Sequence, residues 1–189
     1  MTDQEALRRL LLQRSVQQGD FILASGRRSS FYIDCRLTTM SAEGMVIIGR
    51  MGLAAIEGAG WAPQAVGGLT LGADPVAYAI AAASFLNRTA ATSLVDAFTV
   101  RKEAKTHGTK RLIEGNLRDG DAVVVVEDVI TSGASAARAA SAIEDAGGNV
   151  LGVLAVVDRE EGGRQMLESA GRKVVTLIGV SDLGLDQGQ

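Results

Sequence analysis

Residues 123–135 carry the clearest structural signal in the chain, Val123-Val124-Val125-Val126-Glu127-Asp128-Val129-Ile130-Thr131-Ser132-Gly133-Ala134-Ser135. Four consecutive β-branched residues are typical of a strand that is buried on both faces of a parallel sheet. We expect this strand to span residues 122–127, with the two acids at its carboxyl end. Open α/β sheets bind their ligands just beyond the carboxyl ends of the strands. The acid pair therefore indicates a candidate binding site.

The small residues that follow the acids predict a phosphate site. Residues 131–135 lead into an alanine-rich segment that we expect to form a helix over residues 134–146. Small residues let backbone amides approach a phosphate, and the positive end of a helix favours its charge. A phosphate site beside two carboxylates suits a phosphorylated sugar. The alternatives are two exposed acids in a turn, or Mg²⁺ held by few protein ligands and by substrate phosphates.

Strands and helices alternate along the rest of the chain. Thr2 and Glu5 match a capping box at the start of the first helix, and Asp74 is expected to cap a helix that has Pro75 at its first position. We expect helices over residues 2–18, 41–59, 75–86 and 165–170, a strand–turn–strand unit over 21–34, and strands over 65–69, 92–100, 151–157 and 174–180. This order predicts an α/β fold with a mostly parallel central sheet flanked by helices.

Composition favours one ordered domain spanning residues 1–189. The chain is 47% hydrophobic with a net charge of −3, so it has no global attraction to nucleic acid or to anionic membranes. The only cysteine, Cys35, fits a reducing compartment and is expected to pack in the core. The longest apolar stretch, around residues 76–86, is too short to span a bilayer. We expect a cytoplasmic protein without nucleic-acid or membrane partners.

Two common nucleotide-binding loops are absent from the sequence. A P-loop requires a Gly-Lys dipeptide, which the chain lacks, and the Gly58-Ala59-Gly60 stretch lacks the third glycine of a dinucleotide-binding fingerprint.

A basic segment lies between the strands expected over 92–100 and 122–127. It contains Arg101, Lys102, Lys105, Lys110 and Arg111, together with the only histidine, His107. A solvated surface loop is the ordinary explanation of such a segment. Beside a phosphate site, however, a cationic lid is favoured, because lysine and arginine stabilise the charge that develops on a leaving pyrophosphate.

Residues 127–135 resemble the phosphoribosyl pyrophosphate (PRPP) signature of type I phosphoribosyltransferases. Residues 25–34, 68–75 and 101–109 resemble, in the same order, segments of the orotate-specific members of that family. The resemblance implies the type I phosphoribosyltransferase fold, with a small hood formed by about residues 1–40 and the C-terminal end. It also implies a homodimer in which the basic loop reaches the neighbouring site.

The implied reaction transfers the 5-phosphoribosyl group from PRPP to orotate and yields orotidine 5′-monophosphate and pyrophosphate, a step of pyrimidine synthesis. The implied PRPP-binding residues are Arg101, Lys102, Lys105, His107, Glu127, Asp128, Val129, Ile130, Thr131, Ser132, Gly133, Ala134 and Ser135. The implied catalytic residues among them are Lys102, Lys105, His107, Glu127 and Asp128. Mg²⁺ is expected to be held mainly through PRPP, near Glu127 and Asp128.

The implied orotate-binding residues are Phe31, Tyr32, Thr131 and Arg159. A planar guanidinium matches a carboxylate in two hydrogen bonds, although a surface salt bridge is the simpler explanation of Arg159. The chain departs from some relatives at Ala24 and Gly72, where those relatives carry lysine. These departures place more of the pyrophosphate binding on backbone amides and on the basic lid.

Three other functions compete with this one. A phosphoribosyltransferase for a different base would share residues 127–135 but not the basic lid. A non-enzymatic regulator with this fold would keep the PRPP loop and lose the lid. An α/β protein that binds a phosphate other than PRPP would explain neither the lid nor Arg159.

Overall fold

The computed structural model describes residues 1–22, 28–88, 93–103 and 112–185. The N-terminal elements are α1 (Asp3–Leu10), a π-helical turn η1 (Leu11–Ser15), β1 (Val16–Ile22), β2 (Arg28–Ile33) and α2 (Arg36–Thr39). The middle of the chain forms α3 (Ala42–Gly58), β3 (Ala65–Leu69), α4 (Ala73–Leu86), β4 (Asp96–Val100) and β5 (Ile113–Gly115). The remaining elements are β6 (Ala122–Ile130), α5 (Ala134–Asp145), β7 (Asn149–Asp158), α6 (Gly163–Ser169), β8 (Val174–Gly179) and a 3₁₀ turn η2 (Ser181–Leu183).

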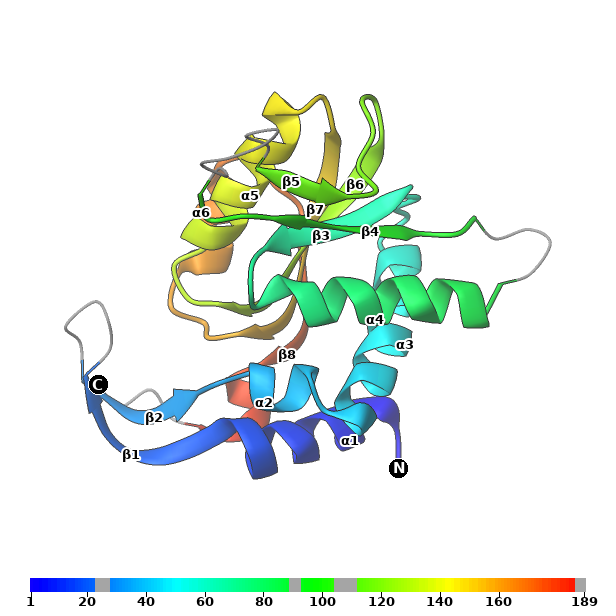
Figure 1. The fold of residues 1–189 in the computed structure, drawn as a ribbon. Helices are drawn as coiled ribbons and strands as arrows, with labels where there is room; N and C mark the ends of the chain where they lie inside the picture. Colours follow the sequence, from blue (N-terminus) through cyan, green and yellow to red (C-terminus); the bar gives the residue numbers. More distant parts are fainter. Residues whose placement is uncertain (23–27, 89–92, 104–111, 186–189) are drawn as a thin grey trace.

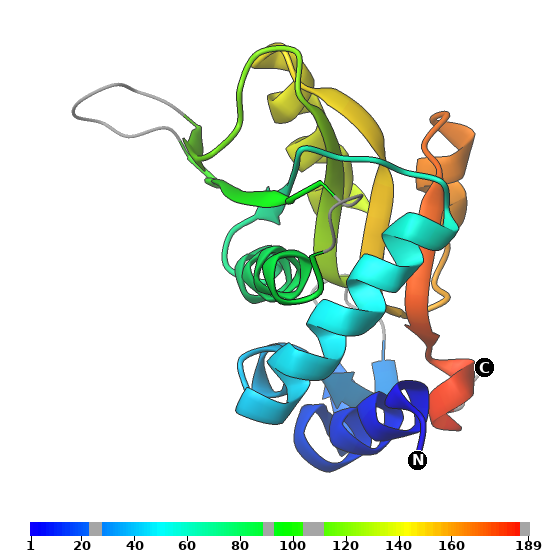
Figure 2. The same ribbon diagram turned by 90° about the vertical axis from the view of Figure 1, so that its right-hand side faces the viewer.

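Six strands form the central sheet in the order β5-β4-β3-β6-β7-β8 (Figure 1). All neighbouring pairs are parallel except β4 and β5, which are antiparallel. Helices α3 and α4 cover one face of the sheet, and α5 and α6 cover the other (Figure 2). The predicted α/β architecture, a mostly parallel sheet between layers of helices, is confirmed.

Strand β6 is buried on both faces, as its valines predict. Val124 and Val126 join the hydrophobic cluster beneath α3 and α4, whereas Val123 and Val125 join the cluster beneath α5. This alternation follows from the two-residue period of a strand. The strand is longer than predicted, because β7 supplies Asp158 as a pairing partner for Ile130. The two acids therefore lie inside the last part of β6 rather than just after it.

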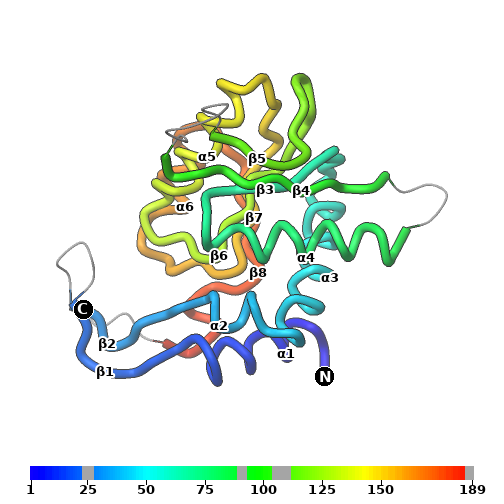
Figure 3. Tube along the Cα trace, viewed as in Figure 1, coloured from blue at the N-terminus to red at the C-terminus, as the bar shows by residue number. Residues whose placement is uncertain are grey.

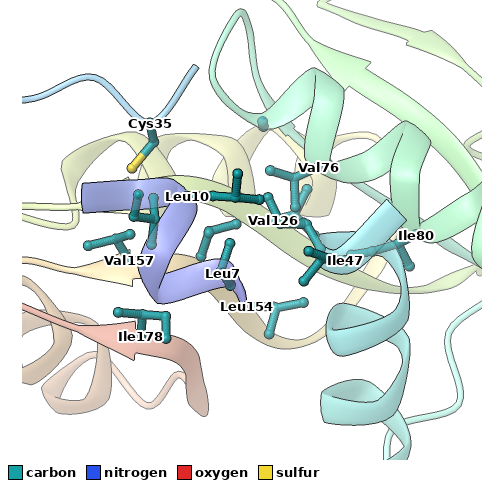
Figure 4. Packing of buried hydrophobic residues seen from close by; sticks show 14 of the residues in the cluster. Leu7, Leu10, Cys35, Ile47, Val76, Ile80, Val126, Leu154, Val157 and Ile178 are labelled. Atoms are coloured by element: carbon teal, nitrogen blue, oxygen red, sulfur yellow. The ribbon is translucent and has the colours of Figure 1, made fainter. Parts of the chain in front are cut away.

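The N-terminal elements lie across the carboxyl ends of the sheet strands (Figure 3). Leu7 and Leu10 of α1 belong to one buried cluster with Val126 and Ile178 of the sheet (Figure 4). Leu183 of η2 belongs to the same cluster. The two ends of the described chain thus pack together over the edge of the sheet where a ligand site is expected.

Several predicted boundaries are wrong. The capping box of Thr2 and Glu5 is present, but the first helix ends at Ser15, because the next residues form β1 and pair with β2. Asp74 does not cap α4; its carboxylate instead accepts a hydrogen bond from Thr99 on β4. Strand β5, with a single apolar side chain, was not predicted. Within the described ranges, no helix is long and apolar enough to cross a membrane.

Candidate active site

A cleft of about 270 Å³ lies between the segment after β2 and the carboxyl ends of β3 and β6. Its lining residues are Tyr32, Ile33, Asp34, Cys35, Arg36, Leu69, Thr70, Leu71, Gly72, Lys102, Glu127, Asp128, Val129 and Ser135. The cleft therefore brings together six residues that the sequence places in the site: Tyr32, Lys102, Glu127, Asp128, Val129 and Ser135.

The predicted phosphate loop forms a smaller pocket beside this cleft. The pocket has a volume of about 80 Å³ and is lined by Glu127 and by residues 129–136. Gly133 begins α5 with a φ of 78°, a conformation that glycine adopts at no steric cost. Since the first amides of a helix have no partner inside the helix, the start of α5 offers donors to an anion.

Helix α6 holds the phosphate loop in place from behind. A Cβ atom at Gly163 would lie 2.4 Å from the carbonyl oxygen of Thr131 and 2.8 Å from the amide nitrogen of Gly133. The loop backbone and the start of α6 are thus in direct contact, which only a residue without a side chain allows.

The acid pair is almost completely buried. Glu127 is 6% exposed and Asp128 is 9% exposed. Burial raises the pKa of Glu127 to about 9, and the neighbouring Asp128 charge acts in the same direction. Burial also raises the pKa of Asp128, against a hydrogen bond that its carboxylate accepts from the amide of Val129. Such strongly shifted carboxylates in a cleft are typical of a functional site.

Lys102 is the described part of the basic segment that reaches the cleft. Its positive charge lowers the pKa of Glu127, opposing the larger effect of burial. Arg138 of α5 donates a hydrogen bond to the carbonyl oxygen of Lys102 and so joins this segment to the helix of the phosphate loop. Arg101 instead faces Glu114, with 3.9 Å between Nη1 and Oε1. The predicted residues Lys105 and His107 lie outside the described residues.

Phe31 and Arg159 lie together beside the cleft but do not line it. The guanidinium carbon of Arg159 is 5.0 Å from the centre of the Phe31 ring, and Arg159 Nε donates to Glu161 Oε1 over 2.7 Å. Phe31 and Arg159 are 2% and 5% exposed. Arg159 therefore does form a salt bridge, but a buried one. Tyr32, on the other side of β2, is 40% exposed and faces the cleft.

Sequence reasoning assigned no site role to the other eight residues that line the cleft: Ile33, Asp34, Cys35, Arg36, Leu69, Thr70, Leu71 and Gly72. Asp34 and Arg36 form a bidentate ion pair, with Nε–Oδ1 and Nη2–Oδ2 distances of 2.8 and 2.9 Å. Leu71 follows β3 at the same edge, and Cys35 is buried in the core as predicted. Burial and the charge of Asp128 raise the pKa of the Cys35 thiol, which keeps it protonated. The position of Asp34 and Arg36 directly after a predicted strand is the signal that could have identified them.

The acid pair is compatible with a magnesium ion that takes only one or two of its ligands from the protein. The described residues contain no group of three or more His, Cys, Asp or Glu side chains arranged so that it could hold a metal ion. Oε2 of Glu127 is buried and accepts no hydrogen bond from the described residues. Mg²⁺ commonly takes one or two carboxylates and completes its shell with water and substrate phosphates.

A phosphate loop and an acid pair at the end of the central parallel strand are the parts expected of a type I phosphoribosyltransferase, and comparison with known proteins agrees. The orotate phosphoribosyltransferase of Aquifex aeolicus is 44% identical over 186 residues, covering 97% of this chain and 98% of that protein. The crystal structure of the Mycobacterium tuberculosis enzyme matches with a TM-score of 0.83 at 42% identity, over 97% of this chain and 100% of that chain. This chain belongs to the orotate phosphoribosyltransferase family.

A second structure of the Mycobacterium tuberculosis enzyme, in complex with PRPP, matches with a TM-score of 0.79 at 39% identity, over 97% of this chain and 100% of that chain. No family model matches the chain.

Proposed function

We propose that this protein transfers the 5-phosphoribosyl group of PRPP to orotate, giving orotidine 5′-monophosphate and pyrophosphate in pyrimidine synthesis. The observation that carries the proposal is the buried Glu127–Asp128 pair directly before the phosphate loop, in a chain of this family. A relative of the same family has been crystallised with PRPP.

PRPP would bind with its 5′-phosphate on residues 131–135 and its ribose against the acid pair. The pocket of the loop and the cleft share Glu127, Val129 and Ser135, so one ligand can occupy both. Carboxylates at the sugar accept hydrogen bonds from hydroxyls and stabilise positive charge that develops on the ring. The acids therefore hold and stabilise the ribose rather than attack it.

The pyrophosphate would leave towards the basic segment. Lys102 lies at the cleft beside Glu127, and Arg101, Lys105 and His107 belong to the same segment of sequence. Cations in a site from which water is excluded stabilise a leaving anion far more than they do in water. No covalent enzyme intermediate is required, because positioning and electrostatics supply the acceleration.

Mg²⁺ is the proposed cofactor. Held near Glu127 and Asp128 and mainly by PRPP, it would neutralise charge on the pyrophosphate. The nearby positive charge of Lys102 favours the ionised form of Glu127, which such an ion needs.

Orotate would lie on the side of Phe31, Tyr32 and Thr131, with its carboxylate on Arg159. A guanidinium stacked on an aromatic ring presents a flat edge that matches a carboxylate. The carboxylate is the group that distinguishes orotate from other pyrimidine bases, which makes Arg159 the residue that selects the base.

We further propose a homodimer, a hood and a cytoplasmic location. Helices α2, α3 and α4 contact one another and carry exposed large apolar side chains, which are Leu37, Val46, Tyr78 and Phe85, with Met40 directly after α2. Apolar patches of this kind mark interaction surfaces, so a second copy is the proposed partner. The N-terminal elements and η2 would act as the hood of a single domain. The single buried cysteine suits a reducing compartment.

The loss of orotate absorbance in the presence of PRPP and Mg²⁺ tests this function. We expect a loss that requires both added components and releases one pyrophosphate per orotate. Turnover of a different base with no orotate loss would instead favour the alternative, a type I phosphoribosyltransferase for that base.

A further inference from the structure

The turn after β7 gives different partners to two adjacent glutamates. Asp158 Oδ1 accepts a hydrogen bond from the amide of Glu160 over 2.8 Å, and Glu160 adopts a φ of 56°. The Glu160 carboxylate accepts from Ser181 Oγ and from the Ser181 amide, at 2.7 and 3.1 Å, and so ties the turn to η2. Glu161 contacts Arg159 instead, with 2.7 Å between Oε1 and Nε.

Among the ion pairs of the described residues, the Arg159–Glu161 pair is the most buried. The two side chains are 5% and 6% exposed, whereas Arg164 and Glu168 of α6 form a pair of 2.8 Å with side chains that are 41% and 44% exposed. A buried ion pair costs desolvation and often stabilises a protein no more than apolar side chains would. Its presence beside the cleft therefore calls for a role other than stability.

The guanidinium of Arg159 is held on two sides. Glu161 takes its Nε edge, and the buried ring of Phe31 lies 5.0 Å from its central carbon. A guanidinium can meet a carboxylate through Nε and one Nη, or end-on through both Nη atoms. Because Glu161 takes Nε, a second carboxylate would meet the end-on edge.

We propose that Glu161 is a positioning residue that orients Arg159 for the carboxylate of orotate. The proposal rests on the proposed function, which places that carboxylate on Arg159. Glu161 would act on the affinity for orotate and not on the binding of PRPP, because its carboxylate contacts Arg159 and does not line the cleft or the phosphate pocket.

Steady-state kinetics of three Glu161 variants test this role. Glu161→Ala removes the acceptor, and Glu161→Asp keeps the charge but shortens its reach by one methylene. Both should raise KM for orotate about tenfold or more, with kcat and KM for PRPP within about threefold of the parent. Glu161→Gln keeps an oxygen acceptor, so its KM for orotate should stay within about threefold of the parent value. Glu168→Ala, which removes an exposed pair of similar length, is the matched control and should change neither KM.

The outcomes separate this proposal from the function on which it rests. Loss of orotate affinity in Arg159→Ala but not in Glu161→Asp or Glu161→Ala would overturn the role of Glu161 alone. Equal increases of both KM values, or a Glu161→Gln enzyme as impaired as Glu161→Ala, would also overturn it. An Arg159→Ala enzyme with unchanged KM for orotate would instead overturn the assignment of Arg159. If Glu161→Ala does not fold, Glu161→Asp carries the test.

Discussion

A Cβ atom at Gly72 would lie 2.4 Å from Oδ1 of Asp128. The loop between β3 and α4 therefore crosses the acidic end of β6 with no room for a side chain. The nearest atoms belong to the Asp128 carboxylate rather than to backbone, so a larger residue at position 72 would displace that carboxylate. A substitution of Gly72 therefore has a specific physical consequence at Asp128.

Gly72→Ala should impair the reaction more than it impairs folding. Displacement of Asp128 is expected to lower kcat/KM for PRPP by about tenfold or more, while the melting temperature falls by only a few degrees, since the carboxylate can rotate. Gly72→Lys should be at least as impaired, because its side chain is longer than that of alanine. An unchanged kcat/KM for PRPP in the Gly72→Ala variant would show that the reaction does not depend on the present position of the Asp128 carboxylate.

The raised pKa of Glu127 predicts how stability depends on pH. The unfolded chain loses this proton near the ordinary value of 4.5, whereas the folded protein holds it up to about 9. The folded state thus binds more protons between these values, and its stability falls as the pH rises through this window. Glu127→Gln carries no such penalty, so its melting temperature should exceed that of the parent by about 3 °C or more at pH 8.

The same comparison at pH 4.5 supplies the control for Glu127. At pH 4.5 Glu127 is protonated in the folded protein and only about half ionised in the unfolded chain, so the difference in melting temperature should shrink towards zero. A difference that is equal at the two pH values would mean that packing, and not ionisation, separates the variants. Glu127→Gln should also lower turnover, because an amide cannot ionise when PRPP and Mg²⁺ bind and so cannot supply the carboxylate that stabilises positive charge on a ribose.

Lys102→Ala should lower kcat by about a hundredfold with little change in melting temperature. The side chain lines the cleft next to Glu127, and the loss of a cation at a leaving pyrophosphate costs the transition state more than the ground state. Lys173→Ala, an exposed lysine just before β8, is the control and should match the parent in both measurements. Equal kcat values for the Lys102→Ala variant and the parent would remove Lys102 from the reaction.

Two glycines of α3 test the packing of that helix. A Cβ atom at Gly49 would lie 2.5 Å from the carbonyl oxygen of Ala79 in α4, an atom that cannot move without the backbone. Gly49→Ala should therefore lower the free energy of unfolding by about 1–3 kcal/mol in denaturant titrations. At Gly58, at the end of the same helix, no described atom lies within 4 Å of such a Cβ. Gly58→Ala should stabilise the protein by about 0.4–1 kcal/mol, and a loss at Gly58 equal to that at Gly49 would contradict the packing argument.

Elements with a strong local pattern were predictable from the sequence. The strand over Ala65–Leu69 matches the prediction to the residue, because its apolar run ends at a turn. The helix over Ala42–Gly58 is capped by Ser41 and lies inside the predicted range. The only sign in the sequence of the close approach of α3 and α4 is the presence of glycines such as Gly49 inside a helix. By themselves, such glycines indicate only a weaker helix.

Features that depend on contacts distant in sequence were not predictable. Asp74 is a residue type that often caps helices, but its carboxylate accepts a hydrogen bond from Thr99 on β4 instead. Ile113 to Gly115 form a strand only because β4 is there to pair with them. The ion pair between Arg159 and Glu161 depends on the turn at Glu160, which has a left-handed backbone conformation. The pattern of polar and apolar residues does not predict such a conformation.

The most direct test of the central claim is a competition among bases for one supply of PRPP. The protein is incubated with PRPP, Mg²⁺ and equal concentrations of orotate, uracil, adenine and guanine, and the nucleotides formed are identified by mass spectrometry. The proposed function predicts orotidine 5′-monophosphate as the dominant product, formed in equal amount with pyrophosphate. A different nucleoside monophosphate as the main product, with orotate unconsumed, would contradict it.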